Sequence, residues 1–245
     1  IFFLMLCMIL VSCTGQKTGK ENDNNDKIAI EVGEIKFPPQ DVLQLKSYYL
    51  SSSVHVDSID YLIGYNYRLH SLDCMNLKSK SVTQIVLPGD GPDAIVRLSG
   101  IYAQSLDSVW ISDESERAFL IDSVGTIKRM IDLKKYLEDQ EQLLINTNYA
   151  MFTSHLFYNA SRHSLMFLVK HTPSNTFIVK EAFIDEVGKM ATYQLSSSKV
   201  VPDMSKGYAY INFPNVNFVG ENIVYNYPVE SSIYMLDIRT NERKY

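Results

Sequence analysis

Three cysteines are the side chains of this sequence best suited to covalent chemistry, because a thiolate is a strong nucleophile. Cys13 directly follows Ser12 and ends an apolar run, whereas Cys7 lies inside that run. This placement predicts Cys13 as the acceptor of a modifying group. Cys74 is the only other cysteine, so we expect no intramolecular disulfide and interpret Cys74 as a small core residue with an inert thiol.

The segment that precedes Cys13 has the character of an export signal. Residues 1–12 contain no charge and are nearly all apolar, but they are too few to span a bilayer, which takes ~20 residues. They match the apolar region of a signal peptide, and Leu10-Val11-Ser12-Cys13 resembles the bacterial lipobox, in which the cysteine becomes the acylated first residue. We therefore predict a lipoprotein signal peptide at 1–12 and lipidation, as with palmitate, at Cys13. The alternative, a buried N-terminal strand, is disfavoured because a polar tract follows at once.

Residues 13–27 form that polar tract and predict a flexible tether between membrane and domain. Signal peptides normally carry a start methionine and basic residues, so we expect a few residues before Ile1. The acidic stretch Asp23–Asp26 is followed by Lys27 and Ile28, where a calcium loop needs an oxygen ligand and a glycine, so we reject a calcium site. A net charge of −5 gives no electrostatic reason to bind nucleic acid.

Sequence signals for catalysis, cofactor binding and metal binding are weak in the residues that follow the predicted tether. The five histidines have no metal-ligand spacing, and no Gly-x-Ser-x-Gly elbow is present. The stretch 89–92 (Gly-Asp-Gly-Pro) lacks the Lys and helix start of a phosphate loop and is interpreted as a connecting turn. We therefore predict no catalytic, cofactor-binding or metal-binding residue. Paired carboxylates for glycoside chemistry stay open, because they need closeness in space and not in sequence.

Repeated strand patterns indicate how the chain is organised. Four units of short hydrophobic strands end their second strands in Asp73, Asp122, Asp185 and Asp237, which are 49, 63 and 52 residues apart. We interpret these aspartates as turn residues that cap strand ends. The turns at Asp122 and Asp185 echo each other, since each has a glycine three residues further on, Gly125 and Gly188, where a hairpin needs φ > 0. A period of this size is typical of β-propeller blades, whereas a β-sandwich has turns without a longer period. We predict an all-β propeller domain over 28–245, with four blades visible.

Two further features belong to this prediction. The segment 132–144 has apolar residues at helical spacing, which predicts one short helix inserted between the second and third units. Four blades in an open arc would leave apolar faces exposed, so we expect the native protein to continue beyond Tyr245, to six blades in total.

The sequence also resembles a known family, on the stretches 87–92 (LPGDGP), 100–102 (GIY), 105–109 (SLDSV) and 120–128 (LIDSVGTIK). These are similar to bacterial lipoproteins of the 4221 domain-of-unknown-function family, of the Bacteroides type. The resemblance implies a six-bladed propeller at the outer membrane, facing the periplasm or the cell surface, and it brings no catalytic residues. Three tripeptides resemble an O-glycosylation motif of such bacteria: Asp57-Ser58-Ile59, Asp107-Ser108-Val109 and Asp122-Ser123-Val124. Ser58 is the foremost candidate. The alternative is that Asp-Ser starts strands.

Sixteen tyrosines and eleven phenylalanines suit packed sheets, and those on loops suit stacking on a ligand. The leading hypothesis is a membrane-anchored module that binds a glycan, a peptide or an outer-membrane protein. The alternative is a hydrolase or lyase that acts at the mouth of the central channel. A structural role beside an outer-membrane transporter is the third hypothesis.

Overall fold

The computed structural model describes residues 32–38, 48, 50–144, 156–200 and 213–245. The chain divides into two compact units, Ile1–Ile35 and Lys36–Tyr245, and every strand lies in the second. Cys13, the predicted signal peptide and the predicted tether lie outside the described residues. Within the described part, no helix has the length and apolar character needed to cross a membrane.

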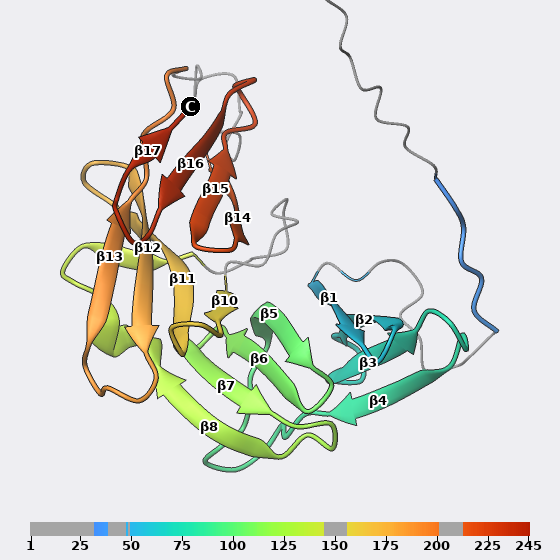
Figure 1. The fold of residues 1–245 in the computed structure, drawn as a ribbon. Coiled ribbons are helices and arrows are strands. Elements are labelled where there is room, and N and C mark those ends of the chain that lie inside the picture. The colour runs from blue at the N-terminus through green and yellow to red at the C-terminus, as the bar shows by residue number, and fades with distance from the viewer. Residues whose placement is uncertain (1–31, 39–47, 49, 145–155, 201–212) are drawn as a thin grey trace, which may run out of the picture. The chain divides into compact units, whose positions relative to one another are not determined.

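Four antiparallel sheets follow one another along the second unit, and we number them as blades one to four (Figure 1). Each blade is a meander of four strands, in which each strand pairs with the one before it. Blade one consists of β1 (Ser51–Val56), β2 (Ile59–Asn66), β3 (Ser71–Asn76) and β4 (Val82–Val86). Blade two consists of β5 (Leu98–Ser105), β6 (Ser108–Asp113), β7 (Arg117–Ile121) and β8 (Ile127–Asp132). Blade three consists of β10 (Leu156–Asn159), β11 (Ser164–His171), β12 (Thr176–Phe183) and β13 (Met190–Gln194), with β9 (Glu141–Leu143) added to the edge of β11. Blade four consists of β14 (Asn215–Val219), β15 (Asn222–Asn226), β16 (Ile233–Asp237) and β17 (Arg243–Lys244).

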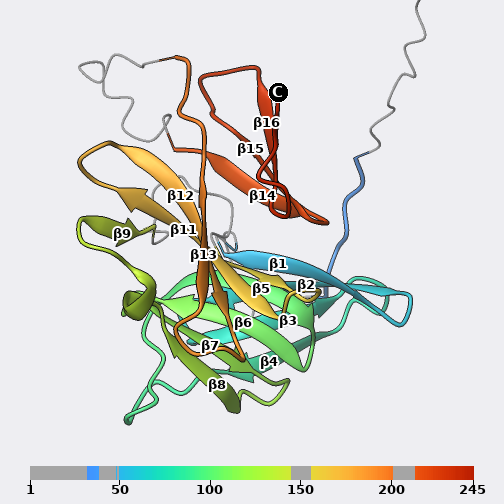
Figure 2. The same cartoon turned by 60° about the vertical axis from the view of Figure 1, so that its left-hand side comes forward.

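This topology confirms the prediction of an all-β propeller with four blades in the described residues. The first strands of neighbouring blades contact one another, β1 with β5 and β5 with β10, and β1 and β5 remain side by side when the view is turned (Figure 2). Those first strands are what the repeat pattern had missed. The pattern placed the four repeat aspartates at the ends of second strands, whereas the structure has them in or just after the third strand of each blade. In blade one, the first strand β1 has the polar sequence Ser-Ser-Ser-Val-His-Val and gives little hydrophobic signal.

Apolar side chains hold each blade to the next. The first core cluster joins blades one and two through residues such as Ile63, Leu72 and Phe119. A second joins blades two and three around Trp110 and Phe167. A third joins blades three and four, and it is rich in tyrosine: Tyr193, Tyr225, Tyr227 and Tyr234. Most of the aromatic residues noted in the sequence therefore fill blade interfaces, where their large apolar area stabilises the stack.

Asp73 does not have the role that the repeat pattern predicted. It lies in the middle of β3, paired with Gly64, and its side chain is fully buried. Its carboxylate accepts hydrogen bonds from the Tyr48 hydroxyl at 2.5 Å, from Asn66 Nδ2 at 2.9 Å and from Gln84 Nε2 at 2.6 Å. A buried carboxylate needs such partners, and residues far apart in the sequence supply them.

Asp122 and Asp237 do cap turns, as predicted. Asp122 accepts hydrogen bonds from the backbone amides of Val124 and Thr126, and Asp237 accepts them from the amides two and three residues further on. In the two echoed turns, Gly125 has φ +84° and Gly188 has φ +81°. A β-carbon on Gly125 would also lie 2.3 Å from the Val86 carbonyl oxygen. Glycine is therefore required there for both its conformation and its size.

The inserted helix predicted over 132–144 is reduced to one turn in the structure. A single 3₁₀ turn, η1, spans Leu133–Tyr136, and Asp132 caps it by accepting from the Lys134 amide. The chain is extended again at Leu137, and Glu141–Leu143 forms β9 instead of a second helical turn. Gln140 has φ +69°, which a right-handed helix excludes. The apolar spacing reflects packing at two blade interfaces, since Leu133 and Leu144 belong to different clusters.

A carboxylate in the turn of blade four ties the chain after β13 to that blade. Glu230 accepts hydrogen bonds from the Ser198 and Tyr234 hydroxyls and from the amides of Lys199 and Val200. Burial raises the pKa of Glu230, but these hydrogen bonds outweigh it and bring the pKa down to about 2. The anion is thus favoured in the folded protein.

Acidification should therefore weaken this tie. Because the folded pKa of about 2 lies below the ordinary value of 4.5, the stabilisation is complete above pH 4.5 and is lost as the pH falls toward 2. We expect Glu230→Gln to lower the urea midpoint at pH 6 but to change it less at pH 3. An equal loss at both values would show that the Glu230 charge does not contribute.

Candidate functional site

A pocket lies where the first strands and first hairpin turns of three blades meet. It has a volume of about 300 Å³. Tyr102 comes from β5, Phe157 from β10, and Phe218 from β14, whose turn into β15 also supplies Glu221. Ser161 belongs to the turn between β10 and β11. Segments about 50 to 60 residues apart in the chain thus build one site, because each blade repeats the same meander.

Three rings form a continuous aromatic wall, which we define as Tyr102, Phe157 and Phe218. The ring centroids of Phe157 and Phe218 are 4.5 Å apart, and those of Tyr102 and Phe157 are 6.4 Å apart. All three side chains are only half-buried. Met166, which is fully buried, also lines the pocket. The wall therefore leaves ring surface available to a bound molecule.

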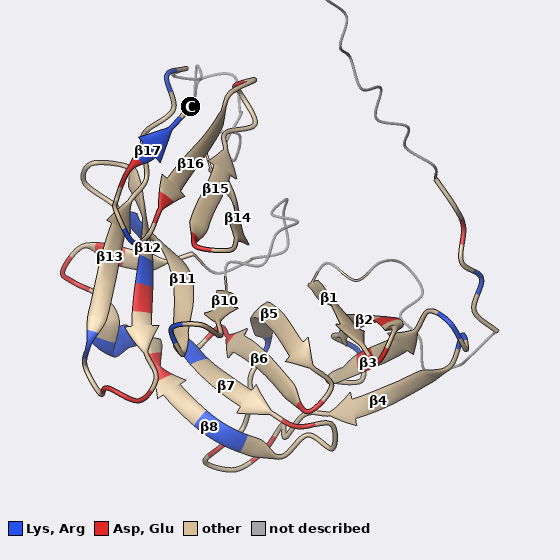
Figure 3. Ribbon diagram, viewed as in Figure 1, with Lys and Arg blue, Asp and Glu red and all other residues tan. Residues whose placement is uncertain are grey.

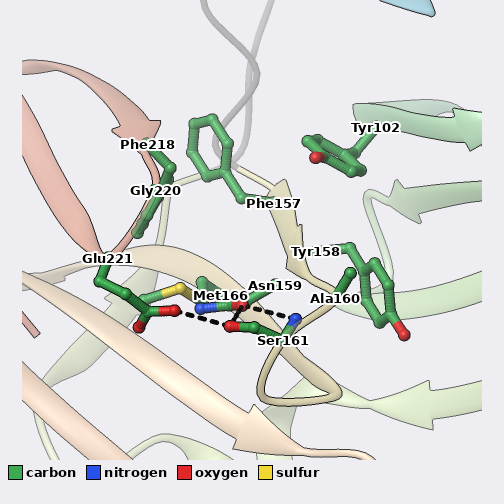
Figure 4. A pocket seen from close by; sticks show the side chains of 10 residues that line it. All are labelled: Tyr102, Phe157, Tyr158, Asn159, Ala160, Ser161, Met166, Phe218, Gly220 and Glu221. Atoms are coloured by element: carbon green, nitrogen blue, oxygen red, sulfur yellow. Dashed lines mark hydrogen bonds between the residues drawn. The ribbon is translucent and has the colours of Figure 1, made fainter. Parts of the chain in front are cut away.

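A polar edge faces this wall, formed by Asn159, Ser161 and Glu221 (Figure 4). The Ser161 hydroxyl lies 2.6 Å from Glu221 Oε1 and 2.8 Å from Asn159 Oδ1. Asn159 Oδ1 also accepts from the amides of Ser161 and Arg162. The edge is thus positioned by its own turn and by a contact between blades three and four. It offers a carboxylate and a side-chain amide to a ligand.

Tyr158 follows Phe157 in β10, and its side chain points to the opposite face of the strand, as expected because successive side chains alternate. Its ring stacks on Trp110, with centroids 5.9 Å apart and planes 24° apart. Burial raises the pKa of Tyr158, and the nearby Asp185 raises it further. Figure 4 shows the Tyr158 hydroxyl directed away from Glu221. Tyr158 therefore fixes β10 against blade two, which positions Phe157.

A second, more open hollow of about 480 Å³ lies between β8 and the turn that joins β12 to β13. Arg129 and Asp185 line it, and they form an ion pair of 3.3 Å. His163 Nδ1 makes a short contact with the same carboxylate, and this hydrogen bond and the Arg129 pair lower the pKa of Asp185. Arg129 and Asp185 thus already have polar partners, and this hollow is the more open of the two, so the pocket with the aromatic wall is the better candidate.

The residues predicted from the sequence lie elsewhere. Ser58 and Asp57 form the two-residue turn between β1 and β2, with φ values of +62° and +49°, and both are exposed. The Asp-Ser pairs do not all start strands: Ser108 begins β6, but Asp122-Ser123 follows the end of β7. Cys74 is buried, and burial raises its pKa to about 12, which agrees with an inert thiol. None of these residues lines the pocket.

The histidines of the described part of the chain each have a polar partner. His55, His70, His163 and His171 are each hydrogen-bonded, to Asp60, Ile95, Asp185 and Ser174 respectively, and His155 lies outside the described residues. No group of three potential metal ligands occurs among the residues described. The described pocket lining contains one carboxylate, Glu221, so these residues do not form the paired carboxylates of a glycosidase.

Sequence reasoning missed Glu221, Ser161 and Phe157. Their only signal was the turn pattern: Gly220-Glu221 separates two strand-like runs by two residues, as a hairpin does. Nothing in the sequence indicated that this turn and the Asn159–His163 turn would meet. The stretch 89–92, by contrast, lies between β4 and β5 and connects blades one and two, as predicted.

Fold and pocket together define a β-propeller domain with a small pocket where the first hairpins of three blades meet. No family model matches the chain, and no curated protein matches it either. Among solved structures, the chain is similar to a member of the DUF4221 family from Bacteroides vulgatus, with 12% identity, a TM-score of 0.41 and coverage of 84% of this chain and 82% of that one. That solved structure comes from the family that the sequence resembles.

Two further structures are similar. A putative exported protein from Bacteroides fragilis has 12% identity and a TM-score of 0.40, over 87% of this chain and 74% of that one. AztD from Citrobacter koseri has 13% identity and a TM-score of 0.44, over 80% of this chain and 45% of that one, so the chain spans less than half of AztD. These likenesses concern the fold alone, and the functional argument rests on the pocket.

Proposed function

We propose that this protein is a lipid-anchored binding module of the bacterial cell envelope, held in the outer membrane through Cys13, whose propeller binds a small ligand in the pocket of the aromatic wall. The observation that carries the proposal is the convergence of ring side chains from three blades opposite a carboxylate and an amide. Ring faces bind apolar or C–H-rich surfaces, and a few polar groups orient the ligand. Glycans and peptides both present such surfaces.

The ring of Phe157 should matter most for binding, because it contacts both other rings of the wall. We expect immobilised glycan and peptide arrays to retain the purified protein. Phe157→Leu should weaken that binding about two- to tenfold, since one aromatic contact contributes roughly 0.5–1.5 kcal/mol beyond its area. Leucine keeps the apolar volume, so the fold should persist. Tyr67→Leu, at an exposed tyrosine outside the pocket lining, should bind normally. Blank arrays, or equal losses in the two variants, would contradict the proposal.

The anchor is supported by the sequence around Cys13. A cysteine directly after the small residue Ser12, at the end of a nearly all-apolar segment and followed by a polar tract, is the arrangement that lipoprotein processing requires. A lipid on sulfur would hold the domain at the membrane without a spanning helix.

Metabolic labelling tests the anchor in the bacterium that produces the protein. We expect incorporation of labelled palmitate, its loss in Cys13→Ser, and its retention in the matched variant Cys74→Ser. After lysis, the native protein should sediment with the outer membrane, and Cys13→Ser should not. Labelling that persists in Cys13→Ser would rule out this attachment site.

Ser58 is a second modification site that we propose, more narrowly. It is exposed at the tip of the first hairpin of blade one, where a glycosyltransferase has access and where an added sugar displaces no packed side chain. Intact-mass measurement of the native protein should then show a glycan mass that Ser58→Ala lacks. A mass explained by the lipid alone would remove the proposal.

A further inference from the structure

We propose that the ligand of this pocket is an amino sugar, a small sugar ring that carries a protonated amine. This inference rests on the proposed function and specifies the chemistry of the same site. Three independent features of the pocket point to it: the unbalanced charge of Glu221, the ring faces of the aromatic wall, and an unused amide donor on Asn159.

The charge of the pocket is negative and has no partner in its lining. Glu221 is the only carboxylic acid among the described lining residues, and none of them is Lys, Arg or His. The Ser161 hydroxyl is the hydrogen-bond donor to Oε1. Arg239 interacts with Glu221 only at longer range, while its guanidinium bonds Asp237 at 3.3 Å. A ligand ammonium would supply the missing charge and a charge-assisted hydrogen bond.

The aromatic wall fits the same ligand from the other side. A cation close to the face of a phenyl or phenol ring is attracted by the negative ring face. A sugar ring also packs well on such aromatic rings, because its C–H faces are apolar. The polar hydroxyl groups lie at the edge of the sugar ring and stay free for hydrogen bonds. A ligand anion, in contrast, would meet both the ring faces and the Glu221 carboxylate unfavourably. The wall therefore favours a cationic sugar over an acidic one.

Asn159 provides the means to orient the sugar. Its Oδ1 is held by the amides of Ser161 and Arg162, which directs Nδ2 away from them, and Nδ2 donates no hydrogen bond to any residue described. A sugar hydroxyl is a suitable acceptor for it. The volume of about 300 Å³ lies at the lower end of the range for ligand sites, which suits a single small ring better than a polymer segment.

Calorimetric titration at pH 6 with glucosamine, N-acetylglucosamine and glucose tests the inference on the whole protein. The three sugars differ mainly at one carbon, where glucosamine alone is charged. We expect glucosamine to bind at least tenfold more tightly than the other two. Glu221→Gln should abolish that preference, with a loss of roughly 10- to 100-fold for glucosamine, as expected for a hydrogen bond to a charged group. Glu242→Gln removes the same charge from an exposed position of blade four and should keep the preference.

The outcomes separate this inference from the proposed function. Equal binding of all three sugars that is lost in Phe157→Leu would overturn the amino-sugar inference and leave the pocket as a binding site. A preference for glucosamine that survives in Glu221→Gln would also overturn it. If none of the three sugars binds, the inference fails, and the array experiment decides the proposed function by itself.

Discussion

Replacing Trp110 by alanine is expected to lower the free energy of unfolding by about 3–5 kcal/mol, the usual cost of removing a large buried aromatic side chain. Trp110 is 1% exposed and lies in the cluster that joins blades two and three. It also stacks on Tyr158, so its loss leaves a cavity and frees the strand that carries Phe157. For a protein of this size, the melting temperature should fall by roughly 6–20 °C.

Thermal unfolding followed by far-ultraviolet circular dichroism measures this effect. Fluorescence is unsuitable, because Trp110 is the only tryptophan of the chain. Trp110→Phe retains an aromatic ring, so its loss of unfolding free energy should be less than half of the loss in Trp110→Ala. Tyr67→Ala removes an aromatic residue that is 56% exposed and should stay within about 0.5 kcal/mol of the wild type. A Trp110→Ala protein as stable as Tyr67→Ala would show that this blade interface is not packed as described.

Removal of the Lys180 charge is the second change with a large expected effect. Adjacent basic and acidic segments in β12 are visible in Figure 3; they correspond to Lys180 and Glu181, both fully buried. Lys180 Nζ lies 2.7 Å from Glu141 Oε2, and the Glu141 side chain is 4% exposed. Glu181 faces the other way and pairs with Arg162 at 3.1 Å. Each charge is therefore compensated at a different face of the sheet.

We expect Lys180→Met to destabilise the protein by about 3–5 kcal/mol, because it leaves the Glu141 carboxylate buried without its partner. The double variant Lys180→Met/Glu141→Leu should recover most of this loss, since replacing both charges of a buried pair by apolar residues is often neutral. Urea unfolding of the single and double variants measures the difference. A double variant no more stable than Lys180→Met would mean that the pair is not the reason for the loss.

Local signals in the sequence predicted local structure well. The echoed Asp-x-x-Gly turns were correct, because φ > 0 at Gly125 and Gly188 is a requirement that the turn itself imposes. The repeat period also predicted the propeller, since blades of similar length recur whatever packs between them. The helix over 132–144 was too long because two blade interfaces, and not one helix face, explain its apolar spacing.

Features built by residues far apart could not be predicted in the same way. Asp73 resembled a turn residue by its position in the repeat, but its partners include Tyr48, 25 residues away. The contact of Ser161 with Glu221 spans 60 residues, and no pattern within either turn indicates it. Lys180 and Glu181 are neighbouring charged residues in the sequence, and only the packed sheet shows that both are buried.

The central claim is that a ligand binds between the aromatic wall and Glu221. A crystal structure of the protein with glucosamine, or with the best array ligand, tests it most directly. We predict ligand density against the ring of Phe157, with a polar group of the ligand within hydrogen-bond distance of the Glu221 carboxylate. A ligand bound at any other place, with this pocket empty, would contradict the account.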